Sequence, residues 1–100
     1  MNLLLAFSVA IALFPIQMPT DVTWVKDAES VHTVLDTYAE QNNTFSPTGL
    51  AVKIGDSCII YTVDLQDVRT EEIYIHEYMH CMGLNHEQIA EIRNRTALRI

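Results

Sequence analysis

Residues 76–86 read H-E-Y-M-H-C-M-G-L-N-H, and this stretch decides how the rest of the chain is interpreted. If it begins as a helix, His76 and His80 lie one turn apart on one face, so both imidazoles can bind the same metal ion. Glu77 lies about 100° round the helix from His76, which suits contact with a water on that ion better than ligation. Gly83 tolerates the left-handed conformation that ends a helix, so it predicts a sharp turn that returns His86 to the metal.

Three neutral imidazoles leave one position of a tetrahedral zinc site open, which is typical of catalytic rather than structural zinc. The alternative is a buried helix whose histidines are ordinary core residues. Three of the four histidines in the chain fall in this stretch, and that alternative does not predict such clustering. We therefore expect Zn²⁺ to be bound by His76, His80 and His86, with Glu77 as the catalytic base. The fourth histidine, His32, lies far from the motif and is not expected to be a ligand.

The stretch resembles the metzincin metallopeptidases, whose consensus is H-E-x-x-H-x-x-G-x-x-H. All five defining positions match, namely His76, Glu77, His80, Gly83 and His86. The resemblance implies a zinc metallopeptidase that hydrolyses peptide bonds, with a peptide or protein as substrate. It also implies that a strand before the zinc helix forms the upper rim of the cleft and pairs with extended substrate. Either residues 61–63 or their partner strand can supply this rim.

The chain after His86 differs from the metzincin pattern. Its fourteen residues contain no methionine, so the resemblance is to a minimal form without the methionine turn. Two other functions remain open: a zinc hydrolase acting on another amide or ester, and a weak or inactive zinc-binding or partner-binding module derived from a metallopeptidase. The intact Glu77 favours activity, because a retired enzyme has no need of a base between its ligands. A zincin with Glu87 or Glu91 as third ligand is disfavoured by His86 at the motif spacing.

The N-terminal segment has a composition of its own. Residues 3–16 are almost wholly apolar, and no charged residue precedes Asp21. Such a run is too short to span a bilayer comfortably, but it suits the hydrophobic core of a signal peptide. We therefore predict a signal peptide or membrane anchor over 1–19 and a zincin-like catalytic domain over 20–100. Export would make the protein secreted or extracytoplasmic. The alternative is a hydrophobic N-terminal element of the fold itself.

Charge and cysteine content limit the partners and the compartment. The formal net charge of −7 argues against nucleic acid and anionic membrane surfaces as partners, since both require patches of Lys and Arg. Any membrane contact is expected only through the N-terminal segment. Cys58 and Cys81 are the only possible intramolecular pair. In an exported chain they suggest a disulfide, although two buried free thiols fit the sequence nearly as well.

Hydrophobic periodicity predicts an α+β fold. Asp27 is a candidate N-cap for an amphipathic helix over 27–41. Two β-prone runs, 50–54 and 58–63, are joined by a short link that contains glycine, which is a hairpin signal. We expect a small, mainly antiparallel sheet built on this hairpin and covered by two helices.

The zinc-binding helix is one of those two helices. We expect Thr70 to cap it, and its apolar residues spread over nearly all faces, which predicts a buried helix. A short β-prone segment at 22–25 precedes the first helix. A short C-terminal helix over 87–100 completes the predicted fold.

Overall fold

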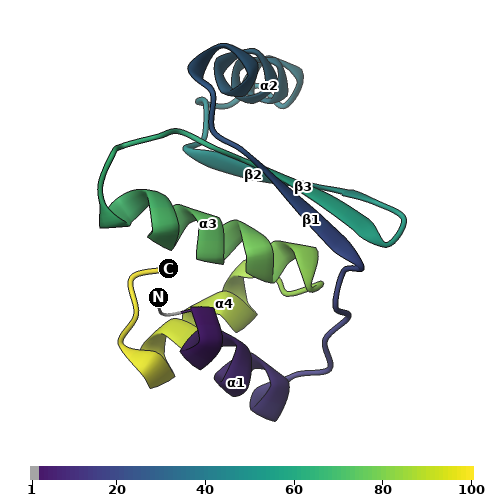
Figure 1. Ribbon diagram of the computed structural model, residues 1–100, viewed down its shortest axis with the longest axis vertical. Helices are drawn as coiled ribbons and strands as arrows, with labels where there is room; N and C mark the ends of the chain where they lie inside the picture. Colours follow the sequence, from purple (N-terminus) through teal and green to yellow (C-terminus); the bar gives the residue numbers. More distant parts are fainter. Residues whose placement is uncertain (1–2) are drawn as a thin grey trace.

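The computed structural model describes residues 3–100 and arranges them in layers (Figure 1). A three-stranded sheet has α2 on one face and α3 on the other, and α1 and α4 lie beneath α3. In chain order the elements are α1 (Leu3–Leu13), β1 (Asp21–Val25), α2 (Ala28–Gln41), β2 (Gly49–Ile54), β3 (Ser57–Thr62), α3 (Val68–Cys81) and α4 (His86–Thr96).

The sheet has the order β1-β3-β2 and confirms the predicted hairpin. Strands β2 and β3 are antiparallel, and Gly55 in the turn between them has a φ of +59°. Strand β1 pairs in parallel with the other edge of β3, so the sheet is mixed. This pairing is supported by Trp24, whose indole N–H donates to the Thr62 hydroxyl at 2.9 Å and whose ring packs on Tyr74 of α3. The α+β fold class is therefore confirmed, with one parallel pair beside the hairpin.

One side of α3 packs against the central strand. Along β3 every second residue is buried, and this alternation directs Cys58 and Ile60 towards α3. Cys58 is bonded to Cys81 at the end of α3, with their Cα atoms 6.0 Å apart. The disulfide is therefore present, rather than two free thiols. It closes a loop between residues 23 positions apart, and such a link stabilises a fold by about 3 kcal/mol.

The opposite side of α3 faces the main hydrophobic core. Ile75, Met79 and Met82 contact buried residues of α4 and the two fully buried alanines of α1, Ala6 and Ala10. The helix is therefore covered on both sides, as its apolar composition predicts. The buried residues of this core are Ala6, Ala10, Ile75, Met79, Met82, Leu84, Ile89 and Ile92.

The apolar N-terminal run forms a helix that packs into the fold. The ring of Phe7 contacts Tyr78 of α3, with ring centroids 5.0 Å apart. Among residues 3–100 no helix combines the length and apolar character needed to cross a membrane. The signal peptide or anchor over 1–19 stays a prediction, and α1 has the contacts of a hydrophobic element of the fold.

Two predicted helix boundaries are wrong, and one is confirmed. Helix α3 starts earlier than expected because Asp67 is its N-cap, while the Thr70 hydroxyl accepts a hydrogen bond from the Leu65 amide. Helix α4 ends at Thr96, because Ala97 adopts a left-handed conformation with φ of +58°. Asp27 caps α2 as predicted and accepts from the Ser30 amide.

Candidate metal centre

The turn after α3 brings the third histidine of the motif back to the first two. Gly83 has a φ of +91°, and its amide donates to the His80 carbonyl at 3.0 Å. The Leu84 amide donates to the Met79 carbonyl at 3.1 Å, which completes a Schellman motif. Nothing lies within 4 Å of an added Cβ at Gly83, so backbone conformation rather than space favours glycine there. The turn predicted at Gly83 is confirmed.

His76, His80 and His86 converge on one point. Each offers a ring nitrogen, and these three atoms lie within 4.8 Å of one another. The centroids of the His80 and His86 rings are 4.7 Å apart, and those of His76 and His80 are 4.9 Å apart. Nitrogens on a tetrahedral zinc ion would lie about 3.4 Å apart, given Zn–N bonds of about 2.1 Å. Small side-chain rotations would bring the three nitrogens to this spacing. The donor group therefore fits a tetrahedral zinc ion with one position open.

The surroundings of His76 and His80 also favour the neutral imidazole that binds a metal. The Nδ1 atom of His80 lies 2.9 Å from the Leu84 carbonyl oxygen. A proton on Nδ1 would donate to that oxygen and leave Nε2 free for a metal. Burial, with help from the neighbouring His80 and His86, lowers the pKa of His76 to about 4. Burial also lowers the pKa of His80. Both rings are therefore neutral near pH 7, and the neutral form is the one that binds metal.

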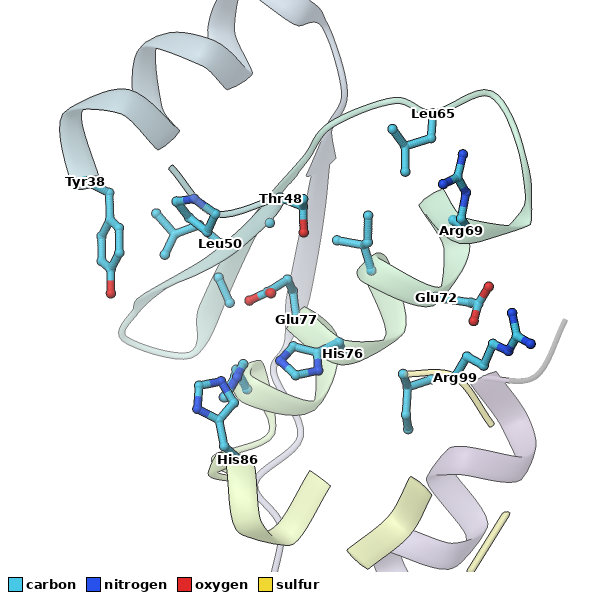
Figure 2. Close-up of a pocket in the computed structure, with 16 residues that line it drawn as sticks. Tyr38, Thr48, Leu50, Leu65, Arg69, Glu72, His76, Glu77, His86 and Arg99 are labelled. Atoms are coloured by element: carbon cyan, nitrogen blue, oxygen red, sulfur yellow. The ribbon is translucent and has the colours of Figure 1, made fainter. Parts of the chain in front are cut away.

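Glu77 is enclosed between α3 and β2. It is 9% exposed, and burial raises its pKa to about 7, while the backbone amide of Ala51 opposes this shift. Gly49 allows the strand to approach so closely, because a Cβ there would lie 2.6 Å from Ile73 Cγ2 and 3.2 Å from Glu77 Oε2. Figure 2 shows the Glu77 carboxylate beside His76 in the cleft. A carboxylate in this environment is suited to accepting and returning a proton near neutral pH.

A cleft of about 880 Å³ runs between β2 and α3 and contains all four motif side chains. In Figure 2, Tyr38 and His86 lie towards one end, and Leu65, Arg69 and Arg99 lie towards the other. The residues that line it are Tyr38, Pro47, Thr48, Gly49, Leu50, Ala51, Leu65, Arg69, Glu72, Ile73, His76, Glu77, His80, His86, Arg99 and Ile100.

The rim of the cleft is β2 rather than the strand that directly precedes α3. Strand β3 is paired on both edges, whereas β2 is an edge strand. Of the two predicted rim segments, only the partner strand of 61–63 therefore has an edge free for another chain. Sequence reasoning missed Tyr38, Gly49 and Ala51 as cleft residues. No local signal in the sequence linked Gly49 to Glu77.

Comparison of the chain with known protein-family models, curated proteins and solved structures gave no match. The chemistry of the centre is therefore inferred from its residues and geometry. Among residues 3–100, His76, His80 and His86 form the one cluster of three or more His, Cys, Asp or Glu side chains arranged to hold a metal ion. His32 lies exposed on α2 outside this cluster.

The shifted pKa values of His76 and Glu77 oppose each other in the metal-free protein. The pKa of His76 falls from 6.5 to about 4 on folding, so acidification through this range favours the unfolded state, which binds more protons. The pKa of Glu77 rises from 4.5 to about 7, so acidification through that range favours the folded state. Between about pH 4.5 and 6.5 these two contributions to the free energy of unfolding nearly cancel, and the lowered pKa of His80 adds to the destabilising side.

We expect Glu77→Gln to remove this balance. Without metal, the variant should lose on the order of 1–2 kcal/mol of stability, relative to the parent protein, when the pH falls from 7 to 5. Urea unfolding at both pH values with a chelator measures this difference. Glu72→Gln is the matched control, because it removes a carboxylate from the same helix and cleft. Identical pH responses of the parent and Glu77→Gln would contradict the opposed titrations.

Proposed function

We propose that the protein is a zinc-dependent metallopeptidase of the metzincin type. The observation that carries this proposal is the convergence of His76, His80 and His86 within 4.8 Å, in a cleft that also holds a buried glutamate. Three imidazoles with an open fourth position are the ligand set of a catalytic zinc site. The motif H-E-x-x-H-x-x-G-x-x-H supplies the same residues in the same order.

Each side chain has a distinct role in this proposal. His76, His80 and His86 hold the ion through neutral nitrogens, and the Leu84 carbonyl orients the His80 ring. A bound Zn²⁺ supplies the chemistry of a Lewis acid, because it polarises the scissile carbonyl and lowers the pKa of a water to about 7. Glu77 accepts the proton of the attacking water and then donates it to the leaving amine.

The shape of the cleft supports a peptide substrate. The free edge of β2 borders the cleft beside Glu77, through Gly49, Leu50 and Ala51. An extended peptide can pair with such an edge through main-chain hydrogen bonds. This arrangement would hold a scissile bond between β2 and the histidines, within reach of Glu77.

The disulfide supports an extracytoplasmic location. Disulfides persist mainly in oxidising compartments, and Cys58–Cys81 joins the central strand to the end of the helix that carries two ligands. We propose that the protein acts after export, with peptides or proteins as its partners.

Metal analysis paired with a cleavage assay tests the proposed function. Purified protein should contain about one zinc per chain and cleave an unstructured protein such as casein. A chelator should abolish cleavage, and added Zn²⁺ should restore it. His86→Ala should bind zinc well below one per chain. Zinc binding without cleavage of any peptide would support a binding module, and cleavage of model esters alone would support another hydrolase. Full zinc content in His86→Ala would contradict the three-histidine site.

A further inference from the structure

Among residues 3–100, the ring of the third histidine, His86, has ring contacts with His76 and His80 but no hydrogen bond to fix it. The His86 side chain is exposed, and among residues 3–100 its ring makes no hydrogen bond. The His80 ring differs, because it is part-buried and contacts the Leu84 carbonyl. The position of the His86 imidazole therefore depends on the link between α3 and α4.

This link is closed from both sides by hydrogen bonds. On the α3 side, the amides of Gly83 and Leu84 complete the Schellman motif described above. On the α4 side, the Asn85 side chain accepts from the Gln88 amide at 2.9 Å. The Gln88 side chain accepts in return from the Asn85 amide, also at 2.9 Å. These two bonds form a capping box, and His86 is the first helical residue inside it.

Leu84 connects the two hydrogen-bonded motifs. It is 3% exposed and is the one residue between Gly83 and Asn85. Its amide belongs to the Schellman motif, and its carbonyl faces His80. This short link thus orients the His80 ring directly, and it fixes the backbone position of His86 through the capping box.

We propose that Asn85 and Gln88 are positioning residues that hold His86 ready for the metal. The inference rests on the three-histidine zinc site of the proposed function. A ligand that is already in place loses little conformational freedom when the ion binds, so metal affinity increases. Groups that orient a ligand without touching the metal change its affinity by roughly 10- to 100-fold.

Helix stability alone would be a simpler role for a capping box. Helix α2 provides the comparison, because Asp27 caps it through a hydrogen bond from the Ser30 amide, yet α2 carries no ligand of the cluster. Loss of either cap should cost a similar amount of stability. Only loss of the α4 cap should also weaken zinc binding.

Zinc affinity measured by competition with a chromophoric chelator tests the proposal. Asn85→Ala should weaken Zn²⁺ binding by about tenfold. Asn85→Ser, which keeps a capping oxygen, should stay within about twofold of the parent, and so should Asp27→Ala. In a His86→Ala background, Asn85→Ala should cause no further loss, because the residue that it positions is gone.

A second readout separates positioning from folding. Circular dichroism should show helix content close to that of the parent in every variant used. The visible spectrum of bound Co²⁺ should lose tetrahedral intensity in Asn85→Ala and keep it in Asn85→Ser and Asp27→Ala.

Three outcomes would overturn the inference. The first is an unchanged zinc affinity in Asn85→Ala. The second is a loss of zinc affinity in Asp27→Ala equal to that in Asn85→Ala. The third is the same loss of affinity when Asn85→Ala is added to His86→Ala. These results concern the positioning role alone and leave the proposed zinc site standing. If His86→Ala itself kept the parent affinity, the three-histidine site would fail, and the positioning role would fail with it.

Discussion

Glu77→Gln is expected to keep its zinc and lose nearly all hydrolysis. The amide has the size of the carboxylate, so the helix and the three histidines should stay in place. It cannot take a proton from the attacking water, and loss of a general base lowers the rate by about 10²- to 10⁴-fold. Zinc content and the initial rate of peptide cleavage, measured on the same preparation, check both parts of this prediction.

Two variants serve as controls for Glu77→Gln. Glu72→Gln removes a carboxylate that lines the same cleft one turn before His76, and it should leave zinc content unchanged with a far smaller effect on rate. His80→Ala should lose zinc and activity together. Undiminished cleavage by Glu77→Gln would remove this residue from the mechanism, and loss of zinc would make it a ligand instead.

Zinc is expected to raise the melting temperature substantially. In the proposed site, zinc would bind the folded chain through residues from α3 and α4, and the unfolded chain does not hold these together. At a free zinc concentration of about 100 times Kd, binding adds about 2.7 kcal/mol to the free energy of unfolding. For a domain of this size, that free energy corresponds to a shift of about 10–20 °C.

Thermal melts at pH 7.5, with zinc and with a chelator, measure this shift. His80→Ala is the control, since it lacks a central ligand and should melt at nearly the same temperature in both conditions. The disulfide should be kept oxidised throughout, because its reduction would lower stability by a separate route. If the parent melted at the same temperature with zinc and with chelator, zinc binding would not stabilise the folded state and the prediction would be wrong.

Local patterns in the sequence predict much of this fold. The hairpin, the cap at Asp27, the turn at Gly83 and the burial of α3 all follow from residues close together in the chain. The meeting of the three histidines also follows, because a helical spacing and one glycine turn are sufficient to bring them together.

Features that depend on distant residues could not be predicted in the same way. The β propensity of residues 22–25 does not specify a pairing direction, and the parallel pairing of β1 with β3 is accompanied by packing of Trp24 on Tyr74. Asp67 and Thr70 are both good caps, and residue type alone does not show that the Thr70 hydroxyl accepts instead from the Leu65 amide, five positions earlier. The burial of Glu77 depends on Gly49, which lies 28 positions earlier (77 − 49).

The order of the elements places the whole candidate centre in one continuous stretch of the chain. Gly49 at the rim, the disulfide, the three histidines and the capping box all lie between residues 49 and 88. Helix α1 and strand β1, which complete the core and the sheet, both precede this stretch. Loop-closure entropy grows with the length of chain between two contacts. The contacts that build the candidate centre therefore close shorter loops than the contacts between α1 and α4, so they cost less loop-closure entropy.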